Sequence, residues 1–208
     1  MRFVIFVILL LTGCSPSKDS LYNKLSKDDL GNTRYEGHFK IGGSYSIRGK
    51  TYTPIKKTTH LQYNETGIAS WYNDHGKKTA NGERFNQYSL TAAHRTLPLP
   101  CVVKVTNIRN NKSLIVMLND RGPFPRAPHK DRIIDVSAKA ASLLGFKTAG
   151  LTMVKVEYLH EETKILLAKL NLEATHGSKS KYKVKNPECT VNCHIKLVNL
   201  KYKLAKTF

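Results

Sequence analysis

The residue best suited to chemistry in this sequence is Asp120, because of where it stands. It follows an unbroken apolar run, residues 114–118, and it precedes the pair Gly122-Pro123. Glycine and proline stop a strand, so the carboxyl group is predicted to lie where the chain leaves a buried sheet, which is a frequent position for binding and catalytic groups. There it can act as an acid or base, or it can cap the turn by accepting backbone N–H groups.

The elements that must position this carboxyl group are short. Five segments are typical of strands: residues 67–72, 101–108, 113–118, 132–136 and 154–159. Residues 109–112 (RNNK) predict a hairpin between the second and third of them. Ser137 is a helix N-cap for residues 138–144, and Gly145 is the left-handed stop. Several short strands with one small helix favour a small β-barrel with a single core.

The composition is strongly basic. Lys and Arg number 34 against 15 Asp and Glu, for a formal net charge of +19. This predicts an anionic partner such as a cell-wall polymer or lipid head groups, and a solubilising surface is the alternative. No nucleic-acid module is recognisable, so no nucleic acid is expected as a partner. Metal-ligand spacing, a phosphate-binding glycine loop and a nucleophile elbow are also missing, so neither a metal nor a cofactor is expected.

The first residues resemble an export signal. Arg2 gives a positive start, and residues 3–11 form an apolar run that is too short to span a bilayer. Residues 11–14 (LTGC) close it with small residues before a cysteine, which is typical of a bacterial lipoprotein signal. Residues 1–13 are therefore predicted to be a signal peptide, and Cys14 is predicted to carry the acyl chains that anchor the protein.

Export also decides how the other cysteines are interpreted. Cys101 opens an apolar run and is predicted to be a buried small hydrophobe. Cys189 and Cys193 are close enough in sequence for a small disulfide loop in an oxidising compartment. A zinc half-site is the alternative, although no second half with suitable spacing accompanies it.

Six short motifs follow one another in the middle of the chain: residues 67–72 (GIASWY), 78–83 (KTANGE), 90–98 (LTAAHRTLP), 105–107 (VTN), 119–124 (NDRGPF) and 132–137 (RIIDVS). In this order and approximate spacing they resemble the rare lipoprotein A (RlpA) family. Residues 45–54 also resemble the segment that often precedes the family's domain. The resemblance implies a mainly β fold, namely a six-stranded double-psi β-barrel with one short helix, as in expansins and barwin-like proteins.

The resemblance also implies an activity, that of a lytic transglycosylase acting on peptidoglycan, with a preference for glycan strands stripped of stem peptides. Such an enzyme cleaves the bond between N-acetylmuramic acid and N-acetylglucosamine without water, because the sugar's own C6 hydroxyl attacks C1 and forms a 1,6-anhydro ring. With an intramolecular nucleophile, one carboxyl group can do the work that usually needs two. That group must be protonated near neutral pH, so its pKa should be raised. The alternative is a non-catalytic, expansin-like glycan-binding or wall-remodelling lipoprotein.

Individual residues can be matched to the family's pattern. Asp120 matches the essential aspartate, and Glu83 and His94 match a functional glutamate and histidine. Glu83 can tune the pKa of Asp120 or bind sugar hydroxyls, and a solvated loop residue is its alternative. His94 can orient a carboxylate or bind the substrate, and a satisfied structural residue is its alternative. Asp135 matches the acid of expansin-like barrels and is a second acid candidate, with a structural role near a helix N-terminus as its alternative. Asn86 stands where the family often has aspartate, so this chain lacks a charge at that position.

Five further residues are candidates for contact with sugar: Trp71, Tyr72, Asn81, Arg121 and Phe124. The aromatic rings can stack on sugar faces, and core packing is the alternative for each of them. Arg121 can bind substrate hydroxyls or carboxylates, or it can pair with Asp120.

The expected organisation has four parts: a signal peptide (1–13), a lipid-anchored linker and extended arm (14–64), the barrel domain (65–159) and a basic tail (160–208). Within the second part, the glycines and alternating Tyr and Ile of residues 41–54 predict a short hairpin or an extended arm. The tail has no convincing match to the SPOR domain that many family members carry. We expect a monomer in the cell envelope, lipid-anchored to a membrane, facing the periplasm and acting on peptidoglycan glycan strands. Divisome proteins and other wall enzymes are further candidate partners.

Overall fold

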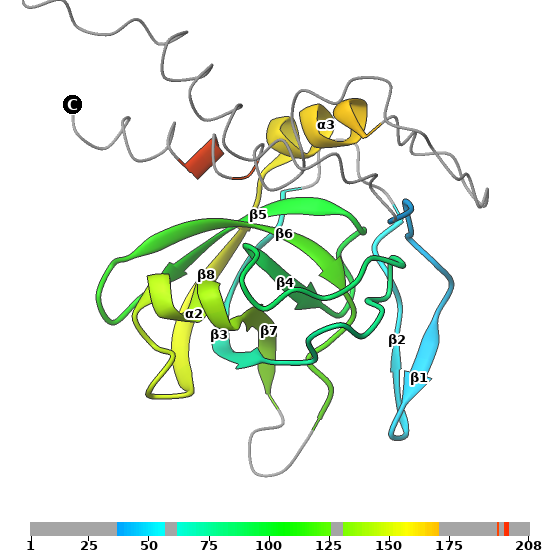
Figure 1. The fold of residues 1–208 in the computed structure, drawn as a ribbon. Helices are drawn as coiled ribbons and strands as arrows, with labels where there is room; N and C mark the ends of the chain where they lie inside the picture. Colours follow the sequence, from blue (N-terminus) through cyan, green and yellow to red (C-terminus); the bar gives the residue numbers. More distant parts are fainter. Residues whose placement is uncertain (1–36, 57–61, 126–130, 171–194, 196–197, 200–208) are drawn as a thin grey trace, which may run out of the picture.

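Six strands of the computed structural model close into a barrel (Figure 1). The structure describes residues 37–56, 62–125, 131–170, 195, 198 and 199. The barrel strands are β3 (Asn64–Tyr72), β4 (Thr91–His94), β5 (Cys101–Asn107), β6 (Ser113–Asp120), β7 (Arg132–Ser137) and β8 (Leu151–Tyr158). Their order around the barrel is β3-β7-β4-β6-β5-β8. The pairs β3–β7 and β4–β6 are parallel and the other neighbours are antiparallel, which confirms the predicted barrel.

The apolar run of β6 is continuous because both faces of the strand are covered. Alternate residues of the run lie in the barrel core. Ile115 and Met117, which lie between them, belong to a second apolar cluster outside the barrel. This cluster also contains Leu166 of helix α3 (His160–Lys169), and Ile195 and Val198 of the later chain. A strand that is buried on both faces has no need of polar alternation.

Helix α2 (Ala138–Leu144) begins and ends where the sequence predicts. The Ser137 side chain accepts a hydrogen bond from the Ala140 N–H, and Gly145 adopts the left-handed conformation with φ of 78°. The Ser137 hydroxyl also donates to the Ser89 carbonyl, at 2.6 Å. The N-cap therefore ties the helix to the segment that leads into β4.

Of the two forms expected for residues 41–54, the structure shows the hairpin, formed by β1 (Tyr45–Ile47) and β2 (Lys50–Tyr52). The hairpin runs beside the barrel (Figure 1) and is hydrogen-bonded to it. The Tyr45 hydroxyl donates to the Arg95 carbonyl at 2.7 Å, and the Arg48 guanidinium donates to the Pro125 carbonyl at 2.7 Å. The described part of the linker is thus attached to the segments that follow β4 and β6, the second of which begins after Asp120.

The C-terminal segment contributes to the barrel wall, which the sequence did not predict. In addition to the expected helix, a second helix, α3, packs against β5. The Asn199 carboxamide accepts a hydrogen bond from the Ile115 N–H at 2.6 Å and donates to the Ile115 carbonyl at 2.8 Å. The pairing of β6 with β4 begins only at Met117, so the Asn199 side chain takes the place of a neighbouring strand at Ile115.

Cys101 is a fully buried free thiol, as expected. The predictions for Cys14, Cys189 and Cys193 lie outside the described residues. Within the described ranges, no helix combines the length and the apolar character that crossing a bilayer requires.

Candidate active site

A β-bulge sets the position of Asp120. Along the β4–β6 pair, Ala92 lies opposite Leu118, but Ala93 lies opposite Asp120, so Asn119 is the extra residue. Such bulges re-aim side chains at the ends of strands. Ala93 pairs on its other side with Asp135 of β7. The two candidate acids are therefore separated by a single strand, β4.

The Asp120 carboxyl group is half-buried and is held by uncharged donors. Its Oδ1 atom accepts the backbone N–H groups of Ala80 and Arg121, each at 2.8 Å, and the Tyr72 hydroxyl lies 3.5 Å from Oδ2. Burial raises the pKa of Asp120 above its ordinary value, these donors oppose the rise, and the charge of Asp74 adds to it. Among the described residues, no cation forms an ion pair with this carboxyl group.

Glu83 lies in the segment that connects β3 to β4, and two side-chain amides hold its carboxylate. Asn81 Nδ2 and Asn119 Nδ2 donate to Oε2 at 3.1 and 2.9 Å. The Asn81 N–H also reaches the Asn119 carbonyl, at 3.3 Å. The connecting segment is therefore fastened to the bulge, and Glu83 is bound to the residue next to Asp120. Asn81, a predicted sugar contact, is fully buried and acts on Glu83.

The predicted aromatic contacts have mainly structural surroundings. The Tyr72 ring stacks on Phe85, with centroids 4.3 Å apart, and its hydroxyl points to Asp120. The pKa of Tyr72 is raised by burial and then by the charges of Asp120 and Asp135. The Trp71 indole donates to the Lys147 carbonyl at 3.0 Å and packs against the core. Phe124 lies against the two hairpin tyrosines.

Asp135, the second acid candidate, is bound much more tightly than Asp120. Its Oδ1 accepts the Ser70 hydroxyl, and the Arg132 guanidinium lies 3.0 Å from Oδ1 and 3.3 Å from Oδ2. Burial raises the pKa of Asp135, while Ser70 and Arg132 oppose the rise. Arg132 also donates to the Phe124 carbonyl at 3.0 Å. This cluster fixes the backbone that follows Asp120.

Arg121 binds backbone and does not pair with the Asp120 carboxylate. Its Nη1 atom donates to the carbonyls of His94, at 3.2 Å, and Leu97, and its Nη2 atom donates to the Ile41 carbonyl at 3.0 Å. The side chain thus joins β6, the turn after β4 and the N-terminal arm. Its link to the acid runs through its own N–H group.

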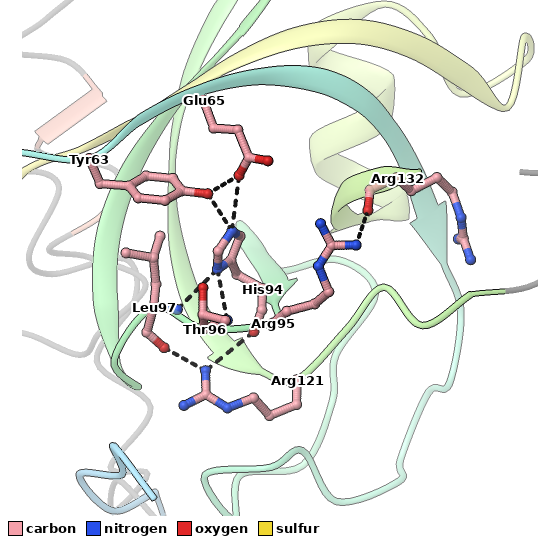
Figure 2. Close-up of polar contacts among 8 residues, drawn as sticks. All are labelled: Tyr63, Glu65, His94, Arg95, Thr96, Leu97, Arg121 and Arg132. Carbon is pink, nitrogen blue, oxygen red and sulfur yellow. Dashed lines mark hydrogen bonds and ion pairs between the residues drawn. The ribbon is translucent and has the colours of Figure 1, made fainter. Parts of the chain in front are cut away.

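His94 ends β4 and is buried, at 2% exposure. Figure 2 shows its ring between Tyr63 and Glu65 on one side and the turn 94–97 on the other. Nε2 lies 2.9 Å from the Tyr63 hydroxyl and 3.9 Å from Glu65 Oε2. Nδ1 accepts the N–H groups of Thr96 and Leu97, at 3.2 and 3.0 Å. Burial lowers the pKa of His94, and Glu65 partly opposes this.

Several residues of this arrangement were not among the predicted site residues. Tyr63, Glu65 and Ser70 come from β3 and the residues before it, and they meet their partners only when the barrel closes. Asn119 was the one that the sequence could most readily have suggested, because it directly precedes Asp120. Asn86, the position without a charge, is exposed and its side chain caps a turn by accepting the Tyr88 N–H at 2.9 Å. In the described part of the chain, no three His, Cys, Asp or Glu side chains are grouped to hold a metal ion.

Comparison with known proteins places this arrangement in a family. The family model described as "Lytic transglycolase" matches residues 64–158. The endolytic peptidoglycan transglycosylase RlpA of Rickettsia felis is 52% identical over 222 residues, which cover 97% of this chain and 94% of that protein. The chain belongs to the RlpA family. The Rickettsia bellii protein of the same name is 51% identical over 228 residues, covering 98% of this chain and 97% of that protein.

The RlpA match confirms the double-psi β-barrel that the motifs implied. Among solved structures, the Streptomyces papain inhibitor is similar over 47% of this chain and 94% of its own, with 21% identity and a TM-score of 0.38. Within the RlpA barrel, the structure brings together Asp120, Glu83, Tyr72 and Asn81, and places Asp135 across β4 from them. The side chains of His94 and Arg121 do not join this group. The His94 carbonyl accepts from the Arg121 guanidinium, and the Arg121 backbone N–H donates to Asp120.

Proposed function

We propose that this protein is a lytic transglycosylase that cleaves the glycosidic bond between N-acetylmuramic acid and N-acetylglucosamine in peptidoglycan. The observation that carries the proposal is the environment of Asp120, a half-buried carboxyl group whose pKa is raised and whose partners are uncharged donors. An acid of this kind keeps its proton to higher pH than an ordinary aspartate. The name of its relatives, endolytic peptidoglycan transglycosylase, supports the same reaction class.

In the proposed reaction, Asp120 acts first as an acid and then as a base. Its carboxyl proton passes to the bridging oxygen, and the bond between that oxygen and C1 of the muramic acid sugar breaks. The C6 hydroxyl of the same sugar forms a new bond to C1, and its proton passes to the Asp120 carboxylate. The products are a 1,6-anhydro end and a free hydroxyl on the glucosamine end. No water is consumed, and the acid is restored.

Glu83 is assigned to substrate binding in this proposal. Its carboxylate is partly exposed and is held by Asn81 and Asn119 beside the bulge, so it is already oriented before substrate arrives. Sugar hydroxyls are suitable donors to it. The preference for strands without stem peptides is part of the proposal and is supported by the motif resemblance.

We also propose that the protein is lipid-anchored through Cys14, faces the periplasm and acts as a monomer. The support is the lipoprotein pattern of residues 1–14 and the net charge of +19, which suits anionic wall polymers. Replacement Cys14→Ser tests the anchor. The variant should leave the membrane fraction, and a variant that sediments with membranes as the wild type does would contradict the anchor. Divisome and wall-enzyme partners stay a prediction.

The decisive experiment digests purified, amidase-treated sacculi with the full chain in detergent and identifies the products by mass spectrometry. We expect anhydromuramyl products from the wild type and none from Asp120→Asn. Sacculi with intact stem peptides, digested in parallel, test the preference for denuded strands. Binding to sacculi without any such product would favour a non-catalytic, expansin-like module and would overturn the proposed reaction.

A further inference from the structure

His94 is matched to a functional residue, yet it has no surface from which to touch a glycan. Its exposure is 2%, and both ring nitrogens are already engaged by the protein (Figure 2). A residue in this position acts through its neighbours. The question is which neighbours carry its effect to the reacting group.

The contacts of the ring decide where its proton is. Nδ1 accepts two backbone N–H groups, from Thr96 and Leu97, so it carries no proton. The proton of the neutral ring is therefore on Nε2, which lies 2.9 Å from the Tyr63 hydroxyl. The Tyr63 hydroxyl in turn donates to Glu65 Oε2. The donors point in one direction, from His94 through Tyr63 to the Glu65 carboxylate.

The other side of the ring leads to the acid. The turn that Nδ1 organises presents the carbonyls of His94 and Leu97 to the Arg121 guanidinium. The backbone N–H of Arg121 donates to Asp120 Oδ1 at 2.8 Å, and it is one of two backbone donors to that atom. Figure 2 shows the contacts from Tyr63 and Glu65 through His94 to the Arg121 guanidinium, and the hydrogen bond from the Arg121 backbone N–H continues this path to Asp120 at the end of β6. A shift of the turn moves the anchor of Arg121 and with it a donor to Asp120.

We propose that Tyr63 and Glu65 are positioning residues for Asp120, because they hold His94 in the form whose Nδ1 organises the turn that anchors Arg121. The proposal rests on the proposed function, since it concerns the acid of that reaction. It also gives His94 a role as a positioning residue and not as a proton donor to substrate.

The charged groups around His94 agree with a neutral ring. Glu65, Arg95 and Arg121 are the groups whose charges act on it, one acidic and two basic. A second proton could only be added at Nδ1, where it would face the N–H groups of Thr96 and Leu97. Protonation would therefore break the turn.

Replacement Tyr63→Phe isolates the hydroxyl. The Tyr63 ring lies edge-on to His94, with centroids 5.3 Å apart, and phenylalanine preserves that packing. The matched control is Tyr158→Phe, which removes a partly buried hydroxyl at the end of β8 that interacts with Thr163 and is outside the path. Both variants are made in the full chain and assayed on amidase-treated glycan strands.

For Tyr63→Phe we expect kcat to fall about tenfold, with KM changed less than about twofold. The basic limb of the pH profile of kcat/KM should move to higher pH. The reason is that the Arg121 N–H lowers the pKa of Asp120, so a displaced N–H lets that pKa rise. Tyr158→Phe should move neither quantity. An unchanged kcat and an unchanged basic limb in Tyr63→Phe would overturn the proposal.

Two variants of His94 test the direction of the path. Asparagine places an acceptor near the position of Nδ1, whereas glutamine reaches toward the position of Nε2. We expect His94→Asn to keep about tenfold more activity than His94→Gln, because it still accepts from the turn. Equal loss in both, with folding intact by circular dichroism, would favour a direct proton-transfer role and contradict the proposal.

Nuclear magnetic resonance separates this proposal from the proposed function. Nitrogen shifts of the His94 ring should report an unprotonated Nδ1 in the wild type. A carboxyl titration should report a higher pKa for Asp120 in Tyr63→Phe than in the wild type. If the wild type releases no anhydro product but the Asp120 pKa responds to Tyr63→Phe, the reaction is wrong and the path stands. If the wild type is active and the pKa does not respond, the path is wrong.

Discussion

Asp120 and Asp135 lie on opposite sides of the same strand, and both have a pKa raised by burial. Their partners differ. Asp120 meets two backbone N–H groups and a hydroxyl, whereas Asp135 meets a serine and a guanidinium at 3.0 Å. Neutral donors let a carboxyl group gain and lose a proton with little rearrangement. The Arg132 guanidinium opposes protonation of Asp135, since a proton on that carboxylate would remove the charge that forms their ion pair.

The two environments also differ in what they hold in place. Arg132, fixed by Asp135, donates to the Phe124 carbonyl, four residues after Asp120. The carboxylate of Asp135 therefore supports the backbone that follows Asp120. In the proposed reaction, their different partners divide two similar acids into a reacting group and a supporting group.

The largest effect is expected from Asp120→Asn, which should lower kcat by about 10²–10⁴-fold. The amide still accepts from Ala80 and Arg121 but has no proton of suitable acidity. Rates of anhydro-product release measure this loss. A variant that keeps more than a tenth of the activity would show that Asp120 is not the acid.

The same replacement should preserve or increase stability at neutral pH. Because the folded pKa of Asp120 is raised, its contribution to stability is complete below the unfolded pKa and is lost as pH rises through the folded pKa. Asparagine does not titrate, so this pH-dependent loss of stability is absent in the variant. Thermal unfolding followed from acidic to neutral pH should therefore show a smaller decline in Tm for Asp120→Asn than for the wild type.

For Asp135→Asn we expect the opposite pattern, namely a large loss of stability and a small loss of activity. This replacement breaks the ion pair between Asp135 and the Arg132 guanidinium, whose side chain is 16% exposed. We expect the free energy of unfolding to fall by about 1–3 kcal/mol, while kcat falls by no more than about tenfold. Denaturant unfolding and the glycan assay measure the two quantities. The reverse result, a large activity loss at unchanged stability, would exchange the roles of the two acids.

Local sequence predicted the parts of the fold that depend on neighbouring residues. Ser137 and Gly145 bound α2 because an N-cap and a left-handed stop act over three or four residues. Asp120 ends β6, as the apolar run and Gly122-Pro123 predicted. Strand β4 was not predicted, because its four residues become a strand only through parallel and antiparallel partners on either side.

The contacts of the site depend on residues far apart in the chain, and no local pattern encodes them. Ser70 is separated from Asp135 by 65 residues, and Asn119 from Glu83 by 36. The motifs fixed which residues were candidates, but barrel closure decides which of them meet. The same reason explains why Asn199, 84 residues after Ile115, was not predicted to complete the wall of β6.

A smaller effect, within the environment of Asp120 itself, is expected from Tyr72→Phe. The hydroxyl lies 3.5 Å from Oδ2, a long contact, and it lowers the pKa of Asp120. Its removal should raise that pKa and move the basic limb of kcat/KM to higher pH, with a change in kcat of about two- to fivefold. The ring stack on Phe85 is preserved. A limb that moves to lower pH would mean that the hydroxyl does not donate to this carboxyl group.

The smallest effect is expected from Asp74→Asn, and its sign is opposite. Asp74 is exposed and its negative charge raises the pKa of Asp120, so the neutral variant should move the basic limb to lower pH by about a few tenths of a unit. Lys77, 2.6 Å from Asp74 Oδ1, provides the matched control. Lys77→Gln removes the neutralising charge and should move the limb to higher pH. Both shifts should shrink as salt screens the exposed charges, whereas the shift in Tyr72→Phe, which arises from a direct contact, should persist.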